Sequence, residues 1–248
     1  MDQVELARTI ETTAYRSWKP RECVEYDGWE LRFADGFSRR GNSVYPIGAS
    51  TLPHDEKLDW CRRWYDRRDL DLVFRQTVAT EPGLDDVLDA AGFTMEGRTH
   101  VMVGAAGSGP VGIDVSSTPH ESWWDTTATL WGFDLSAPGG WSAIIDRIDL
   151  PAGFVCVPGE AAGLAIVDGS WMGLFEIVVA EQSRRLGLGT AVTQALVNWG
   201  SDRGAEHVYM QVVADNEPAI ALYESLGFTR AYTYWYRRDQ ARSAKSPA

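Results

Sequence analysis

The chain has 248 residues, of which 44% are hydrophobic and 23% charged, a balance typical of a globular fold. Because 35 Asp and Glu outnumber 23 Lys and Arg, the formal net charge is −12, and the clustered positive charge that follows nucleic-acid phosphates is not expected. No apolar run reaches the ~18 residues of a membrane-spanning helix. We therefore expect neither nucleic acid nor a membrane as a partner.

The N-terminus has no basic start followed by an apolar core, which is the pattern of a secretion signal. The three cysteines, Cys23, Cys61 and Cys156, are widely spaced, and the four histidines are scattered. Such spacing is not typical of a disulfide framework or of a metal site. We therefore expect a cytoplasmic protein without a bound metal.

In chain order, the first half is expected to form a strand near 39–44, a helix over 55–68, a strand over 73–80, a short helix, and a last strand after the turn at 92–94. The helix prediction comes from apolar residues at 58, 61, 64 and 65, a helical spacing, with Pro53 as a start signal. A segment rich in glycine and small residues follows from position 104, as in a linker.

The second half repeats this order at a constant offset in residue number. Segments 73–94 and 208–229 align without a gap (208 − 73 = 135) and share seven identities in 22 positions. The same offset places a helix over 190–203 and a strand over 174–179. The sequence thus predicts an α/β (α+β) fold of two tandem domains, each a mixed β-sheet with flanking helices, over residues 1–104 and 113–248 with a linker at 105–112.

The junction between strand 174–179 and helix 190–203 contains the pattern Arg184-x-x-Gly187-x-Gly189. Glycine lets successive backbone N–H groups turn toward one point. The new helix adds unpaired N–H groups and the positive end of its dipole, and the arginine adds positive charge. Together these features predict a cradle for a pyrophosphate, although the pattern matches neither the dinucleotide-binding nor the Walker motif.

A second motif follows, Asn-Glu-Pro-Ala-Ile-Ala-Leu-Tyr-Glu-Ser-Leu-Gly-Phe over 216–228. With the two motifs in this order, beginning at positions 184 and 216, the sequence resembles the GNAT superfamily of N-acetyltransferases over roughly 115–240. The resemblance implies acetyl-CoA as cosubstrate, a sheet that opens where the pantetheine inserts, and transfer of the acetyl group to an amine. It also implies that strand backbone, cradle and second motif bind the coenzyme through Ile177, Val178, Val179, Arg184, Arg185, Leu186, Gly187, Leu188, Gly189, Thr190, Asn216 and Ala219.

Two residues are candidates for proton transfer. Tyr223, which the resemblance places near the thioester sulfur, has an ordinary pKa close enough to that of a thiol to act as the acid, and its alternative is helix packing. Glu176 is a carboxylate within an apolar strand, where desolvation favours a raised pKa suited to a base. Its alternative is an edge-exposed or hydrogen-bonded side chain, and Asp168 and Glu160 are weaker candidates for the base.

The first half lacks this chemistry. The offset of 135 places Arg184, Gly187 and Gly189 on an Ala-x-x-Leu-x-His sequence at 49–54, and Tyr223 on Leu88. This arrangement resembles tandem GNAT proteins, in which a degenerate copy packs on an active one and shapes its acceptor side. Arg39, Arg40 and Asn42 are candidates for that role, and their alternative is a solvated loop.

Together these observations predict an acetyl-CoA-dependent N-acetyltransferase, a monomer or homodimer, that acts on a primary amine of a small molecule or peptide through its C-terminal half. An acyl-CoA-binding sensor or scaffold without catalysis is the alternative. A further possibility is that the first half is an independent protein-binding domain.

Overall fold

The computed structural model describes residues 1–107, 109, 112–137 and 139–240. Positions 108, 110 and 111 of the expected linker, and the end of the second expected domain at 241–248, lie outside the described residues. The helices are α1 (Gln3–Ser17), α2 (His54–Asp66), α3 (Leu84–Ala90), α4 (Glu121–Trp131), α5 (Trp141–Ile145), the 3-10 turn η1 (Glu181–Ser183), α6 (Leu188–Ser201) and α7 (Glu217–Ser225). The strands are β1 (Glu22–Tyr26), β2 (Trp29–Phe33), β3 (Val44–Tyr45), β4 (Val73–Gln76), β5 (Thr94–Ala105), β6 (Val115–Ser116), β7 (Ala152–Val157), β8 (Ala161–Asp168), β9 (Trp171–Val179), β10 (His207–Val213) and β11 (Thr229–Arg238).

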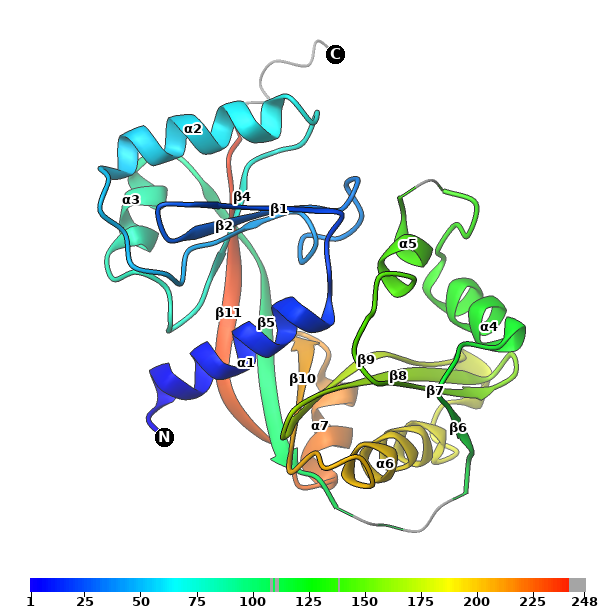
Figure 1. Cartoon of the computed structure of the whole chain (residues 1–248). Helices are drawn as coiled ribbons and strands as arrows, with labels where there is room; N and C mark the ends of the chain where they lie inside the picture. The colour runs from blue at the N-terminus through cyan, green and yellow to red at the C-terminus, as the bar shows by residue number, and fades with distance from the viewer. Residues whose placement is uncertain (108, 110–111, 138, 241–248) are drawn as a thin grey trace.

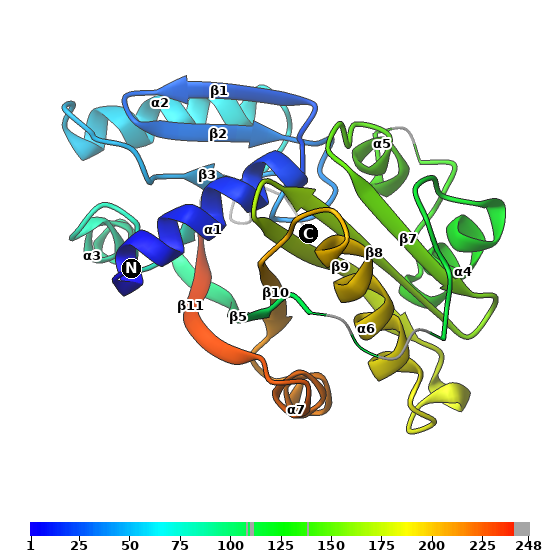
Figure 2. The same cartoon turned by 60° about the horizontal axis from the view of Figure 1, so that its bottom comes forward.

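The strands form one continuous mixed sheet in the order β1-β2-β3-β4-β11-β5-β10-β9-β8-β7-β6 (Figures 1 and 2). At its centre β5 and β11 run antiparallel. Each also pairs with a strand from the other half of the chain, β5 with β10 and β11 with β4. The predicted α/β class with flanking helices is confirmed, and strands from both halves belong to a single sheet.

The predicted elements of the repeat are present with small changes in their ends. Helix 55–68 is α2 and helix 190–203 is α6, while strands 73–80, 174–179 and 208–215 correspond to β4, β9 and β10. The strand expected near 39–44 is only the two residues of β3, because residues 34–42 form a loop around the buried Asn42. The Asn42 side chain accepts hydrogen bonds from the N–H groups of Ala34 and Gly36, so this segment is an ordered loop and not a strand, in which Asn42 is buried and Arg39 is exposed.

The helices cover both faces of the sheet. Around β7–β9, α4 and α5 pack on one face and α6 on the other (Figure 1), and the strand residues alternate accordingly. Leu164 and Ile166 join the core beneath α1 and α4, whereas Ala165 and Val167 join the core beneath α6. This alternation is the period of two expected for a strand with both faces buried.

Helix α1 lies across the centre of the sheet and ties the two halves together. Its Glu11 accepts two hydrogen bonds from Arg75 of β4, at 2.7 and 2.8 Å, and one from the Tyr232 hydroxyl of β11 at 2.7 Å. Both charged side chains are at most 1% exposed. Removing either partner of such a buried ion pair should strongly destabilise the fold, because the remaining charge would be buried without a counter-ion.

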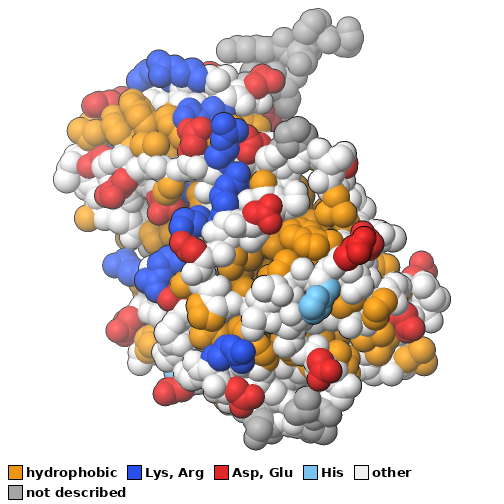
Figure 3. Space-filling view, turned by 45° about the vertical axis from the view of Figure 1, so that its right-hand side comes forward, with side chains coloured by type: hydrophobic (Ala, Val, Ile, Leu, Met, Phe, Trp, Pro, Cys, Tyr) orange, Lys and Arg blue, Asp and Glu red, His pale blue; other side chains and the backbone are white. Residues whose placement is uncertain are grey.

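The surface mixes charges of both signs. On the face shown in Figure 3, Lys and Arg side chains are interspersed with Asp and Glu. No helix in the described part of the chain is long and apolar enough to cross a membrane.

Candidate active site

Strands β9 and β10 separate halfway along β9. They are paired in parallel from Trp171 to Leu174 of β9, whereas β8 stays paired with β9 as far as Val179. The separation coincides with a bulge opposite Ala162–Leu164 of β8. Glu176 lies in this bulge with a φ of 51°, a left-handed conformation that is rare for a residue in a strand. The bulge thereby frees the backbone edge of the half-buried Ile177, Val178 and Val179 from pairing with β10.

The predicted cradle lies directly beyond this edge. After η1, the chain passes through Arg185 and Gly187, with φ of 66° and 82°, into α6. Gly187 is the N-cap and supplies no side-chain hydrogen bond, and the first turn of α6 closes with the Ala191 N–H to the Gly187 carbonyl at 3.0 Å. The N–H groups of Leu188, Gly189 and Thr190 therefore precede the first helical hydrogen bond and are free to bind an anion.

Charge and close packing complete the cradle. Arg184, Arg185 and Leu186 are exposed, and the Arg184 Nε donates to the Val179 carbonyl at 3.4 Å. A Cβ at Gly189 would lie 3.0 Å from the Leu222 side chain of α7 and 3.8 Å from that of Val179. The glycine thus lets the start of α6 approach both α7 and the end of β9, so the structure brings the three segments named by the sequence motifs together.

The second motif forms the start and body of α7. Asn216 is its N-cap, and its side chain accepts a hydrogen bond from the Ala219 N–H at 3.2 Å. Tyr223 is 8% exposed and lies edge-on to the Phe228 ring. Burial raises the pKa of Tyr223 to about 12, so its phenol stays protonated at neutral pH.

The three candidate carboxylates have different surroundings. Asp168 pairs with Arg16 at the far end of β8, and Glu160 is exposed in the turn before β8. Glu176 forms neither a hydrogen bond nor an ion pair with any described residue. Burial raises its pKa to about 7, against the opposing effect of the Arg40 guanidinium. The ionisation of Glu176 therefore falls in the range useful to a base at neutral pH.

Residues of the N-terminal half also reach β9. The Arg40 guanidinium lies over the Trp18 ring, 4.7 Å from its centroid, and 5.5 Å from that of Phe175. Trp18 is the C-cap of α1 and stacks on Phe175 at 5.6 Å. The sequence singled out Arg40 but not Trp18, because only the packing of α1 across the sheet places that ring beside β9.

The corresponding loop of the first half holds a carboxylate of its own. Asp27, in the β1–β2 turn, accepts hydrogen bonds from the N–H groups of Thr51 at 2.9 Å and Leu52 at 2.8 Å. The Lys57 ammonium of α2 lies 3.2 Å from the same carboxylate. These bonds hold the pKa of Asp27 well below its usual range. Two backbone N–H groups of the loop before α2 are therefore already bound to a carboxylate of the same chain.

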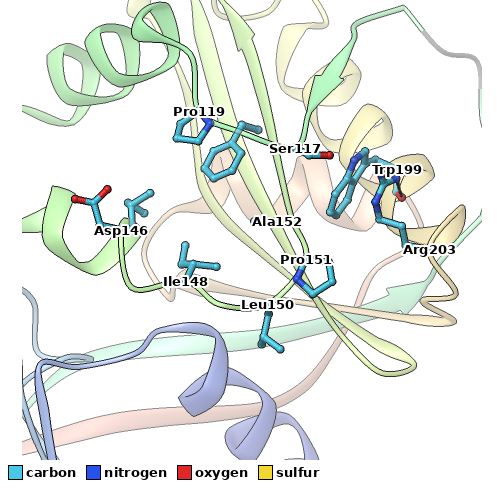
Figure 4. Close-up of a pocket in the computed structure, with 11 residues that line it drawn as sticks. Ser117, Pro119, Asp146, Ile148, Leu150, Pro151, Ala152, Trp199 and Arg203 are labelled. Carbon is cyan, nitrogen blue, oxygen red and sulfur yellow. Dashed lines mark hydrogen bonds between the residues drawn. The ribbon is translucent and has the colours of Figure 1, made fainter.

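A separate cavity of about 430 Å³ lies between the α5 segment, β7 and the C-terminal end of α6 (Figure 4). Ile148, Leu150 and Phe154 supply much of its apolar lining, while Trp199 and Arg203 border it from α6. None of the predicted site residues lines it, since the cradle is at the opposite end of α6. In the ranges that the structure describes, no group of three or more His, Cys, Asp or Glu could hold a metal ion.

A sheet that opens next to a glycine-rich helix start is the arrangement implied by the GNAT resemblance. The chain is a GNAT-type N-acetyltransferase. A sequence model of the family described as "Probable histone acetyltransferase Rv0428c C-terminal" matches residues 6–237, and the chain belongs to this family. It is 28% identical over 242 residues to the "Uncharacterized N-acetyltransferase YobR" of Bacillus subtilis (strain 168). That match covers 93% of this chain and 97% of the relative.

Solved structures share the fold. A GCN5-related N-acetyltransferase from Kribbella flavida has a TM-score of 0.66 at 18% identity, covering 96% of this chain and 95% of its own. A "Tandem GNAT protein from the clavulanic acid biosynthesis pathway" has a TM-score of 0.58 at 14% identity, covering 96% of this chain and 88% of its own. The predicted acyltransferase class is therefore confirmed.

Proposed function

We propose that the enzyme transfers the acetyl group of acetyl-CoA to a primary amine of a small molecule or peptide, at one site in its C-terminal half. The observation that supports this most directly is the uncapped start of α6 beside the unpaired backbone edge of β9. Three free N–H groups, the positive end of the helix dipole and two exposed arginines suit a pyrophosphate. The free edge over Ile177–Val179 suits the amide groups of a pantetheine.

In the proposed transfer, Glu176 is the base for the acceptor amine and Tyr223 is the acid for the leaving thiolate. Glu176 takes a proton from the acceptor ammonium, and the neutral nitrogen attacks the thioester carbonyl carbon. The C–S bond breaks with its electron pair on sulfur, and the thiolate takes a proton from Tyr223. The new amide nitrogen releases its second proton, the phenol is reprotonated, and Glu176 returns its proton to solvent. With a pKa of about 7, Glu176 is about half ionised at neutral pH and becomes fully ionised above it, whereas Tyr223, with a pKa of about 12, stays protonated.

We also propose that the N-terminal half is a degenerate copy of the same fold, with domains at 1–104 and 113–248 joined at 105–112. The starts of α2 and α6 match the offset of 135 to within one position (188 − 54 = 134), and those of β5 and β11 match it fully (229 − 94 = 135). The symmetric strand order about β5 and β11 supports duplication. The Asp27 carboxylate before α2 would repel a pyrophosphate, which supports a single coenzyme site.

The three free cysteines support a reducing, cytoplasmic setting for this activity. The chain would act as a monomer or a homodimer, and mass measurement in solution decides between the two. Neither nucleic acid nor a metal has a role in the proposed reaction.

Titration calorimetry with acetyl-CoA tests the coenzyme site. Wild-type protein should bind, and Arg184→Glu should weaken binding by about 100-fold, because a negative charge then faces the pyrophosphate. Arg8→Glu, a charge reversal at an exposed position of α1, is the matched control and should bind as wild type. Absence of binding by the wild-type protein at millimolar acetyl-CoA contradicts the proposal.

A turnover screen separates the enzyme from the acyl-CoA-binding sensor or scaffold. The screen measures release of free CoA thiol with a panel of primary amines. Amine-dependent release supports the transferase. Tight binding of acetyl-CoA with no release above the amine-free rate on any amine, including peptide N-termini, supports the sensor instead.

A further inference from the structure

Arg40 is held rigidly at the boundary between the two halves. The loop that contains it is fixed by Asn42, whose side chain donates to the carbonyls of Phe37 and Ser38 at 2.7 and 2.8 Å and accepts two backbone N–H groups. The Arg40 carbonyl accepts a further hydrogen bond from the Tyr45 hydroxyl at 3.0 Å. A structured loop thus places the guanidinium beside β9, where it lies over the Trp18 ring.

The charge of Arg40 has no counter-ion among the residues that the structure describes. Its Nε and Nη1 are buried and form no hydrogen bond within the same ranges. Buried guanidinium donors are almost always paired, because an unpaired one costs free energy. The neighbouring Arg39 is the contrast, since it lies 3.1 Å from the Glu96 carboxylate.

Arg40 lies against the ring of Phe175, and the next residue of β9 is Glu176. The Arg40 guanidinium opposes the rise in the pKa of Glu176, yet no ion pair within 4.0 Å joins them among the residues described. A guanidinium and a carboxylate thus lie at the same part of β9, each without a direct partner in the described part of the chain. A molecule that has one charge of each sign, close together, would satisfy both.

A third unpaired donor belongs to the same cluster. The Gln211 Nε2 of β10 is buried without a hydrogen-bond partner in the described ranges, while its Oε1 accepts the Tyr234 hydroxyl at 3.0 Å. That bond orients the amide, so the Nε2 is the group left to donate. Tyr234 belongs to the same core cluster as Trp18 and Phe175, the two rings that Arg40 lies against, so the guanidinium is on the same side of the sheet as this amide. Arg40 and Gln211 thus offer donors from the two sides of the β9–β10 opening.

We infer that the acceptor bears a carboxylate next to its primary amine, as in a free amino acid, with the carboxylate bound by Arg40 and Gln211 and the amine directed to Glu176. This inference rests on the proposed transfer reaction and names its substrate class. Arg40 is then a specificity-determining residue that the N-terminal half supplies to a site in the C-terminal half. The tandem arrangement would thereby have a direct role in choosing the acceptor.

The test compares amine panels on the wild-type enzyme. Each amino acid is assayed beside its carboxamide and its aminophosphonate analogue, with kcat and KM determined for each at saturating acetyl-CoA. We expect the carboxylate to be preferred over the carboxamide by about 100-fold in kcat/KM, because a neutral amide leaves the guanidinium unpaired. A preference for the aminophosphonates would overturn the assignment of a carboxylate, and equal rates on acids and amides would overturn the inference as a whole.

Variants at position 40 connect the preference to this residue. Arg40→Gln should raise KM for the amino acids about 100-fold and leave the carboxamides nearly unchanged, so that the preference collapses, whereas Arg40→Lys should retain part of it. Arg39→Gln, at the exposed neighbour, should keep the wild-type preference. An equal loss on acids and amides in Arg40→Gln would mean that Arg40 only supports the fold, and would overturn its role.

Acetyl-CoA binding, measured by calorimetry on each variant, keeps the two proposals apart. Unchanged coenzyme binding with turnover on neutral amines, but no carboxylate preference, overturns the acceptor class and leaves the transferase standing. Absence of coenzyme binding in the wild-type protein overturns both.

Discussion

The loops that precede α2 and α6 follow equivalent strands of the sheet, but only the loop before α2 binds a carboxylate of the chain itself. Before α2, backbone N–H groups of Thr51 and Leu52 bind the Asp27 carboxylate, and Lys57 adds a positive charge. Before α6, Arg184 and Arg185 are exposed, and no described side chain caps the start of the helix. The loop before the helix thus binds a carboxylate of the chain itself in one half and has exposed arginines in the other.

The difference extends to the residues proposed for catalysis. By sheet pairing, Val44 of β3 corresponds to Gly173 of β9, since Val44 pairs with Phe74 and Gly173 with Tyr209 (74 + 135 = 209). Strand β3 ends at Tyr45, before any counterpart of Glu176. Tyr223 corresponds to Leu88, which is fully buried in the core of the first half. The second half keeps a carboxylate with left-handed backbone and a phenol next to an opening in the sheet.

Among the substitutions that test the difference between the two halves, replacing Glu176 should have the largest effect on turnover. Glu176→Gln removes the proposed base and should lower kcat by about 10²- to 10⁴-fold. In the wild-type enzyme the carboxylate must be ionised to accept a proton, so kcat should rise with pH through about 7, the pKa to which burial raises Glu176. The measurement is a pH–rate profile at saturating substrates.

The rising limb should disappear in Glu176→Gln, while acetyl-CoA affinity stays within about threefold of wild type. Asp168→Asn is a suitable comparison, since that carboxylate is paired with Arg16, and it should retain the limb. If Glu176→Gln kept the wild-type profile, another group would be the base.

The repeat in the sequence accounts for the helices and strands that could be predicted. Local patterns predicted α2, α6, β4 and β10, because helical spacing and the repeat are properties of neighbouring residues. The central position of β5, between β10 and β11, was not predictable in this way. Strand order depends on pairing between residues that are distant in the chain, and either arrangement of the two last strands suits the same local pattern.

The candidate site, too, was predictable from the sequence only where it depends on neighbouring residues. The glycine and arginine pattern before α6 predicted unpaired N–H groups at the helix start. The acidic residue within an apolar strand singled out Glu176, but the sequence did not predict that it lies in a bulge. The roles of Arg40 and Asp27 required the three-dimensional structure. Arg40 meets Phe175 although the two belong to opposite halves of the chain, and no spacing rule brings such residues together.

Replacing Tyr223 should have a smaller effect than replacing Glu176. Tyr223→Phe keeps the packing of the buried ring and removes only the hydroxyl, so acetyl-CoA binding should be retained. Turnover should fall by about 10- to 100-fold, because the thiolate must then be protonated by water. Single-turnover kinetics with a radiolabelled acetyl group measures the chemical step directly, and an unchanged rate would leave Tyr223 with a packing role alone.

Replacing Asp27 should leave catalysis almost untouched and weaken the fold. Asp27→Asn removes the charge that faces Lys57, whose side chain is fully buried, and should lower the Tm by several degrees. Because the pKa of Asp27 is held below its ordinary value, its contribution to stability is present above that value and is lost as the pH falls toward the folded-state pKa. Thermal unfolding of wild type and variant should therefore differ at neutral pH and converge in acid.

The same variant tests why the first half lacks a coenzyme site. Acetyl-CoA affinity at the C-terminal site, measured below the unfolding transition, should be the same for Asp27→Asn and wild type. If the variant gained a second acetyl-CoA site, the Asp27 carboxylate alone would be what prevents the first half from binding the coenzyme. We expect one site, since the loop before α2 has neither the arginine nor the two glycines of its counterpart.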